Sequence, residues 1–205
     1  MSVSQSTPET GRASQPTVDA VYYPRAAVKC VGRLAFRSQG ARDVACLLDV
    51  DPDIASWSCM HTTLSVGIEA HVPDFTASTA SGFTVLIDAP DRRPGVSPAE
   101  IAEAALRDNH TYRIFDFAEL KHGYRLANAK DLLRYGNHSV PLGDRVKLLA
   151  ALEEYSSLTV SECLTVFKET SPMAGLAALA LHGYIEIELD EGPIGPETTV
   201  RRLRR

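Results

Sequence analysis

Three stretches of sequence decide the fold: ARDVACLLDVDPDI at residues 41–54, HVPDF at 71–75 and FTVLIDAP at 83–90. The first reads as a helix and the other two as strands, with Asp74 at the end of one strand and Asp88 on the next. Carboxylates on adjacent strand ends can share a hard cation such as Mg²⁺ or Mn²⁺ through oxygen ligands, and that cation can polarise a phosphodiester. The pattern therefore predicts a metal site built from these carboxylates at one edge of a sheet.

A further component of such a site is missing. Metal-dependent cleavage of a phosphodiester in cores of this kind adds a lysine two residues after the second acid, to position or activate the attacking water. Here that position is Pro90, and a proline supplies neither an ammonium group nor a backbone N–H. The two acids alone form an incomplete site for in-line displacement.

These stretches resemble the TnsA family, the endonuclease subunits of heteromeric bacterial transposases. The family's helix reads roughly ERDALLLLEFDPDV and is followed by a QP pair. One strand then carries the sequence PDF, and the next strand ends with Asp, Glu or Gln, followed by any one residue and a lysine. Residues 41–54 align with that helix without gaps, and RLANAKDLLRY at 125–135 fits a second family stretch. The resemblance covers about residues 25–203. It implies a restriction-endonuclease-like fold of the PD-(D/E)XK type in the N-terminal half.

The chain departs from the family pattern at the catalytic positions. The family's helix glutamate falls on Ala41, its lysine on Pro90 and its QP pair on Cys59-Met60. Only Asp74 and Asp88 remain as catalytic and metal-binding candidates, with Mg²⁺ or Mn²⁺ bound weakly or not at all. The resemblance then implies an inactive TnsA-like subunit, a scaffold or regulator that works with a DDE-type transposase and an AAA+ ATPase and meets DNA within that complex.

An alternative stays open at this stage: an active endonuclease that cuts transposon ends with relocated catalytic residues. The candidates by sequence proximity are Glu69, Asp43, Glu119 and Lys121. Asp43 lies about 200° around the helix from Ala41, because residues advance about 100° each. Glu69 falls on the polar face of the alternating run LSVGIEAHV at 64–72, which we predict to be one strand with Leu64, Val66, Ile68, Ala70 and Val72 on its other face. Asp43 is not expected to substitute for the missing glutamate, and Glu69 and Lys121 are expected to be solvated.

The fold class is α/β, with four segments along the chain. Residues 1–20 have the polar, Ser/Thr/Pro/Gln-rich composition of a disordered tail. Residues 21–124 are predicted to form the nuclease-fold domain, a mixed sheet flanked by helices. Residues 125–155 are predicted to be a helical connector, and 156–205 a mostly helical, winged-helix-like domain.

Several helices after the strand that carries Asp88 are indicated by capping residues and by the spacing of apolar residues. Ser97 and Glu100 form a capping box with proline at the first helical position. Residues 143–155 form a helix with Val146, Leu149 and Leu152 on one face, and residues 159–168 form another whose apolar face holds Val160, Cys163, Leu164 and Phe167. Another helix runs from Pro172 to a Gly183 stop, and two strands separated by a turn-rich loop follow.

The second helix of this domain lacks the side chains that read bases. Residues 172–182 are almost wholly Ala, Leu, Gly and Met, so direct base readout is not expected. The loop beside it is acidic, with Glu186, Glu188, Asp190 and Glu191. Such a surface suits a protein partner better than DNA, although the apolar helix can equally be the core of a small domain. The nucleic-acid candidates are the terminal arginines Arg201, Arg202, Arg204 and Arg205, which either contact phosphates or form a solvated end.

Composition and the absence of other motifs limit the remaining classes of function and location. The chain has 205 residues and a net charge of −5, which lowers the expectation of autonomous DNA binding. It contains no transmembrane run and no apolar signal segment, and we expect a cytoplasmic protein without a membrane partner. The four cysteines have no metal-ligand spacing and are expected to be reduced structural thiols. Trp57 is expected to pack beside the core helix. No phosphate-binding loop, dinucleotide fingerprint or nucleophile elbow occurs.

Overall fold

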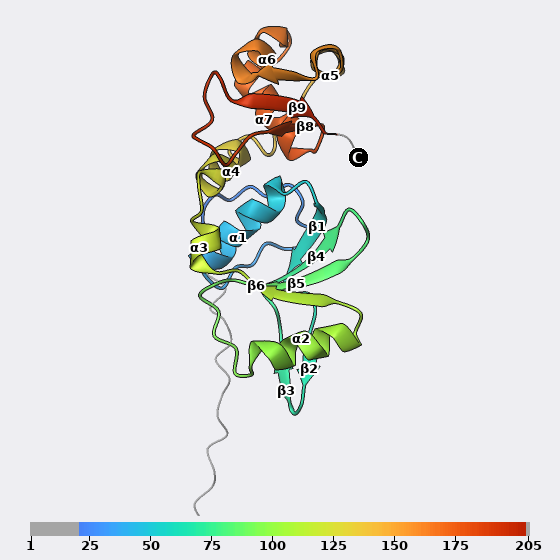
Figure 1. The fold of residues 1–205 in the computed structure, drawn as a ribbon, viewed down its shortest axis with the longest axis vertical. Helices are drawn as coiled ribbons and strands as arrows, with labels where there is room; N and C mark the ends of the chain where they lie inside the picture. The colour runs from blue at the N-terminus through green and yellow to red at the C-terminus, as the bar shows by residue number, and fades with distance from the viewer. Residues whose placement is uncertain (1–20, 204–205) are drawn as a thin grey trace, which may run out of the picture.

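The computed structural model describes residues 21–203. The expected tail at 1–20 and the candidates Arg204 and Arg205 therefore lie outside the described residues. The described chain is a mixed α/β structure with a mixed sheet flanked by helices (Figure 1). Its elements are α1 (Gln39–Val50), β1 (Ile54–Cys59), β2 (Leu64–Val66), β3 (Glu69–His71), β4 (Phe75–Thr79), β5 (Thr84–Asp88), α2 (Pro98–Arg107), β6 (Thr111–Ile114), α3 (Phe117–Leu120), α4 (Arg125–Leu133), α5 (Leu142–Tyr155), β7 (Ser157–Thr159), α6 (Val160–Val166), α7 (Pro172–Leu181), β8 (Ile185–Ile187) and β9 (Thr199–Arg202).

The main sheet has the strand order β1-β4-β5-β6. Strand β4 pairs antiparallel with both β1 and β5. Helix α2 connects β5 to β6, and these two strands pair parallel. Alternation along β5 sends Leu86 and Ile87 to opposite faces. Ile87 packs in the cluster that includes α1 and Trp57, whereas Leu86 packs with Ile101 of α2. The sheet therefore carries a hydrophobic core on each face. Trp57 is 1% exposed, which confirms its packing role.

The run at 64–72 is two strands rather than the single strand predicted. Strands β2 and β3 pair antiparallel, with Val66 opposite Glu69. Gly67 has a φ of +61°, in the left-handed region that glycine adopts without steric cost, and it allows the chain to reverse. Ile68 consequently stands at the hairpin tip, fully exposed. The hairpin's buried face packs on α2 (Figure 1).

The C-terminal half is built on a smaller sheet with the order β7-β9-β8. Helices α5, α6 and α7 surround a core in which Leu148, Leu152 and Cys163 are buried. On α5 the buried face is centred on residues 144, 148 and 152, so the prediction that places Val146 on the packed face is wrong: Val146 is 55% exposed. The predicted apolar face of α6 is confirmed, because Val160, Cys163 and Phe167 are buried and Leu164 packs against them.

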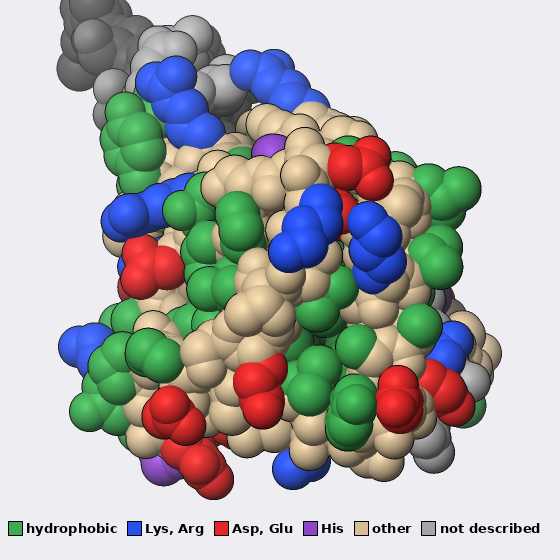
Figure 2. All heavy atoms as spheres, turned by 90° about the horizontal axis from the view of Figure 1, so that it is seen from above, with side chains coloured by type: hydrophobic (Ala, Val, Ile, Leu, Met, Phe, Trp, Pro, Cys, Tyr) green, Lys and Arg blue, Asp and Glu red, His purple; other side chains and the backbone are tan. Residues whose placement is uncertain are grey.

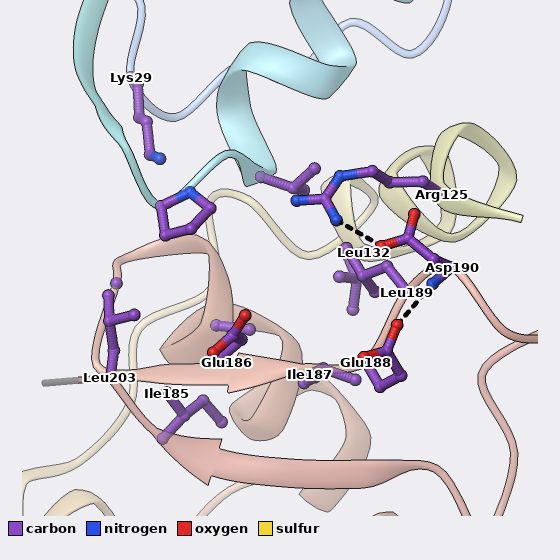
Figure 3. Close-up of a pocket in the computed structure, with 14 residues that line it drawn as sticks. Lys29, Arg125, Leu132, Ile185, Glu186, Ile187, Glu188, Leu189, Asp190 and Leu203 are labelled. Atoms are coloured by element: carbon purple, nitrogen blue, oxygen red, sulfur yellow. Dashed lines mark hydrogen bonds and ion pairs between the residues drawn. The ribbon is translucent and has the colours of Figure 1, made fainter. Parts of the chain in front are cut away.

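Helix α4 joins the two halves, since it contacts both α1 and α7 (Figure 1). At the same junction the end of α1 faces β8 across a small cavity of about 60 Å³, beside which Arg125 and Asp190 form an ion pair of 2.8 Å (Figure 3). This space is far below the roughly 300 Å³ of a typical small-molecule site. No helix among residues 21–203 is long and apolar enough to cross a membrane.

Candidate functional site

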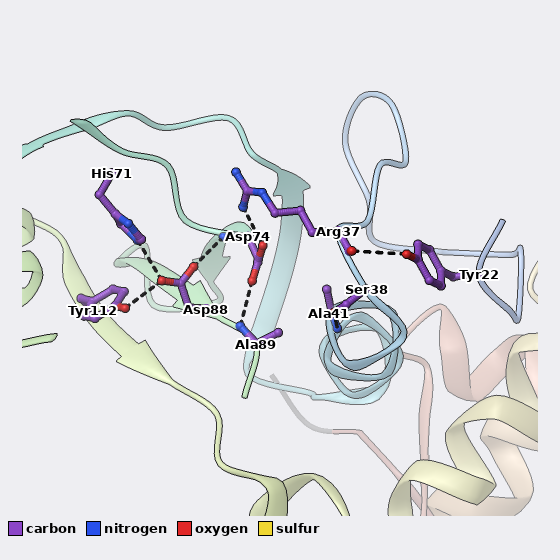
Figure 4. A network of polar contacts seen from close by, with 9 residues as sticks. All are labelled: Tyr22, Arg37, Ser38, Ala41, His71, Asp74, Asp88, Ala89 and Tyr112. Carbon is purple, nitrogen blue, oxygen red and sulfur yellow. Dashed lines mark hydrogen bonds and ion pairs between the residues drawn. The ribbon is translucent and has the colours of Figure 1, made fainter. Parts of the chain in front are cut away.

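The sheet brings Asp74 and Asp88 to one edge. Asp74 directly precedes Phe75, the first residue of β4, and so begins a strand rather than ending one as predicted. Asp88 closes β5, and Phe75 pairs with Ile87 in the antiparallel ladder. Because the start of one antiparallel strand lies beside the end of its neighbour, the two acids meet: the Asp74 N–H donates to Asp88 Oδ1 at 2.9 Å (Figure 4).

The other oxygen of Asp88 is also engaged. Tyr112 of β6 donates its hydroxyl to Oδ2 at 2.8 Å, and His71 Nε2 lies 2.8 Å from the same oxygen. Burial raises the pKa of Asp88, but the hydrogen bonds from His71 and Tyr112 outweigh it, and the pKa lies below its ordinary value of 3.8. Burial and the bond to Asp88 raise the pKa of Tyr112. Tyr112 is therefore the proton donor, and Asp88 is an ionised acceptor.

Asp74 is engaged in the same way. Its Oδ1 forms an ion pair with Arg37 Nη1 at 2.6 Å, and its Oδ2 accepts the N–H of Ala89 at 2.9 Å. The Asp74 side chain is 4% exposed and that of Asp88 is fully buried. Every carboxylate oxygen of the pair therefore has a protein donor.

The family's other two catalytic positions lie in the same neighbourhood. Ala41, on the first turn of α1, is 1% exposed and packs in the same hydrophobic cluster as Phe75 and Ala89. Pro90 follows Ala89 and is buried, and its carbonyl accepts from Arg93. The positions of the family's glutamate and lysine are thus filled by an alkyl group and a ring packed in the interior.

The residues present do not fit a divalent cation. Mg²⁺ demands near-octahedral oxygen coordination and Mn²⁺ prefers the same ligands, so each requires oxygens that can turn lone pairs toward it. Here a guanidinium, a hydroxyl, an imidazole and two backbone N–H groups already hold the carboxylates in place. Within residues 21–203 there is no group of three or more His, Cys, Asp or Glu side chains arranged to hold a metal ion.

The four residues considered as relocated catalytic groups are engaged or exposed elsewhere. Asp43 pairs with Lys130 of α4 at 2.8 Å, on the far side of α1 from the acid pair. Glu119 pairs with Arg113, and Lys121 lies over the ring of Phe117. The remaining candidate, Glu69, is exposed on the hairpin. The structure brings none of them to Asp74 and Asp88.

Arg37, His71 and Tyr112 are the site residues that the sequence interpretation missed. Only His71 lies in a stretch that the sequence analysis singled out, since it opens HVPDF, whereas Tyr112 lies in β6, which follows α2. Arg37 immediately precedes Ser38, the N-cap of α1. Pairing of β6 with β5, with Tyr112 opposite Leu86, is what brings Tyr112 to Asp88.

The charged residues within the family-like helix are structural anchors. Arg42 is fully buried and donates to the carbonyls of Pro24 and Ala26, both at 2.6 Å. Asp49 is fully buried too, and its Oδ1 accepts from the N–H of Lys29 and from the indole of Trp57, both at 2.9 Å. Burial raises the pKa of Asp49 despite these bonds. Both residues fix the segment before α1 onto the helix.

Helix α7, where the sequence analysis looked for side chains that read bases, is packed inside the second half. Seven of the ten residues of α7 are buried, and the helix packs against α6, α4 and α1. The apolar helix is therefore core, which leaves it unavailable to a docked partner. Of the terminal arginines within the described chain, Arg201 is exposed and Arg202 pairs with Glu153. On the face seen in Figure 2, acidic and basic side chains are interspersed.

No protein-family model matches this chain, and no curated protein matches it.

Proposed function

We propose that this protein is a catalytically inactive, TnsA-like subunit of a DNA transposition system, acting as a scaffold or regulator beside a DDE-type transposase and an AAA+ ATPase. The observation that carries the proposal is the state of the acid pair. Asp74 and Asp88 come together at one sheet edge beside Ala41, as the resemblance implies, yet all four carboxylate oxygens are bound by protein donors.

The arrangement of the first half supports a restriction-endonuclease-like fold. Helix α1 covers one face of the sheet, and the acids lie at the edge where β4 starts and β5 ends. The crossover through α2 then adds β6 parallel to β5. Ala41, Asp74 and Asp88 come from three separate elements and lie close together at this end of the sheet, which supports the proposed fold beyond the local motif match.

The arrangement of the second half supports a winged-helix-like domain with a protein-directed role. Helix α5, strand β7, helices α6 and α7 and the hairpin of β8 and β9 follow in that order, and β9 lies in the middle of the sheet. The helix that would enter a major groove is buried, and Glu186, Glu188 and Glu191 are exposed. Acidic side chains there repel phosphates, which favours a protein partner for this half.

The test is a reconstituted transposition reaction with any transposase and ATPase that neighbouring genes encode. Without cleavage of the second strand, the reaction is expected to give replicative cointegrate products, and omission of this protein is expected to reduce their yield. Simple insertions that need this protein and disappear with Asp74→Ala would refute the inactive assignment. Failure of the protein to bind either neighbour would refute the scaffold role.

An active nuclease with relocated residues has no supporting observation. The candidates Asp43 and Glu119 are paired away from the acids, and Lys121 caps the short helix α3 with its ammonium over Phe117.

A further inference from the structure

The segment before α1 places a fixed positive charge on the acid pair. Arg37 Nη1 lies 2.6 Å from Asp74 Oδ1, and the two side chains are 20% and 4% exposed. We infer that the Arg37 guanidinium stands where a divalent cation would bind Asp74, so that it excludes the cation from the site and its removal opens one.

Arg37 is held in position from both sides. Its carbonyl accepts the hydroxyl of Tyr22 at 3.2 Å. The next residue, Ser38, caps α1 by accepting the N–H of Ala41 at 3.0 Å. The close-up in Figure 4 shows the Arg37 side chain reaching from this anchored backbone across to Asp74. The ion pair is therefore set by the start of the helix rather than by a freely moving surface arginine.

The balance of charges at the acid pair explains why a single guanidinium is sufficient to exclude a divalent cation. Asp74 is neutralised by Arg37, and Asp88 is held by His71 and Tyr112. At position 41, one turn into the helix, an alanine adds no further carboxylate. A divalent cation at Asp74 would lie in contact with the guanidinium, and like charges at that distance in a poorly solvated site repel strongly. Without Arg37, Asp74 Oδ1 is the one carboxylate oxygen of the pair left without a donor.

Mn²⁺ binding to the purified full-length protein tests this directly. The electron paramagnetic resonance signal of free Mn²⁺ is followed as protein is added, for the wild type, Arg37→Ala, Arg37→Lys and Arg37→Ala with Asp74→Asn. We expect Arg37→Ala to bind Mn²⁺ about tenfold or more tightly than the wild type. A Mn²⁺ concentration about ten times the Kd of Arg37→Ala is expected to raise the Tm of that variant by about 4 °C and that of the wild type by no more than about 1 °C.

The other variants act as matched controls. Arg37→Lys keeps a cation beside Asp74 and is expected to bind no better than the wild type, and the double variant is expected to lose the gained affinity. Arg37→Met removes the charge and the donors but keeps an apolar stem of similar length, so it provides a folded neutral variant if Arg37→Ala does not fold.

Two results would overturn the inference. One is Mn²⁺ binding by the wild type that Asp74→Asn abolishes, and the other is a folded neutral variant that binds no better than the wild type. Both are measured on the isolated protein, so they are distinguishable from failure of the proposed role in transposition.

Discussion

Replacement of Asp88 by alanine distinguishes between a structural and a catalytic role for this side chain. The change leaves two donors without an acceptor, the N–H of Asp74 and the hydroxyl of Tyr112, and it removes the carboxylate oxygen that lies 2.8 Å from His71 Nε2. An unsatisfied buried donor costs about 1–3 kcal/mol, and removing one partner of a buried ion pair costs about 3–5 kcal/mol. Because these donors share one acceptor and can partly rearrange, we expect the free energy of unfolding to fall by about 3–5 kcal/mol in total.

Asp88→Asn is the matched control. The amide oxygen still accepts from Asp74, and the new NH₂ group can donate to the oxygen of Tyr112, so this variant keeps the side-chain volume and loses the charge and the acceptor at Oδ2. We expect about 1–2 kcal/mol of destabilisation for this variant. An unengaged catalytic carboxylate next to another acid behaves differently, because its removal relieves repulsion and leaves the stability unchanged or higher.

The assay is equilibrium unfolding in urea followed by the fluorescence of Trp57. This is the only tryptophan of the chain. It is 1% exposed and donates its indole N–H to Asp49 at 2.9 Å, so it reports on the core next to the acid pair. A change smaller than about 0.5 kcal/mol for Asp88→Ala, or a stabilisation, would refute the assignment of Asp88 to a structural role.

Three other predictions concern Pro90, the pH dependence of stability and the packing of α7. Pro90→Lys, which restores the family's lysine, is expected to gain no Mg²⁺-dependent nicking of supercoiled DNA, because Asp74 and Asp88 remain bound; any nicking above the wild type contradicts this. The folded pKa of Asp88 is below 3.8, so its stabilisation is complete above that pH and is lost as the pH falls through the lowered value. The difference in Tm between wild type and Asp88→Asn should therefore be constant from about pH 7 to 5 and shrink below about pH 4, and a difference that grows on acidification would be inconsistent with this. Gly175→Ala places a Cβ 2.5 Å from the ring of Phe167. It should lower the free energy of unfolding by about 1–3 kcal/mol, measured by urea unfolding followed by circular dichroism, although alanine is the better helix former by about 1 kcal/mol.

The control for the last prediction is Gly143→Ala on α5. There the added Cβ meets the end of the exposed Glu169 side chain, which can rotate away. Its stability is expected to stay equal or rise by up to about 1 kcal/mol. If both glycine variants lose the same stability, then tight packing at Phe167 is not the cause.

Local patterns in the sequence predicted much of the secondary structure. The capping box at Ser97 starts α2 as expected, and the apolar spacing of α6 gives its buried face. The run at 64–72 was misread because an alternating pattern continues through Gly67, and alternation alone cannot distinguish one long strand from a hairpin. The glycine between two short apolar stretches was the signal for the turn.

The site was predictable only in part, because its donors come from distant segments. Asp74 and Asp88 could be placed at one edge from the strand pattern alone. Their partners Arg37 and Tyr112 lie 37 and 24 residues away from the acids they bind. No periodicity links such positions, since a parallel pairing and a helix cap bring them together. The departures from the family pattern at Ala41 and Pro90 could be read from the sequence, whereas the ion pair between Arg37 and Asp74 required the three-dimensional structure.

The central claim is that the acid pair stabilises the fold and does not cleave DNA. The most direct measurement compares the nicking of supercoiled DNA by the wild type and by Asp74→Ala in Mg²⁺ or Mn²⁺, with any transposase and ATPase encoded by neighbouring genes present. The account predicts no cleavage attributable to this protein, together with intact binding to the partner complex. Cleavage that the wild type supports and Asp74→Ala abolishes would contradict it.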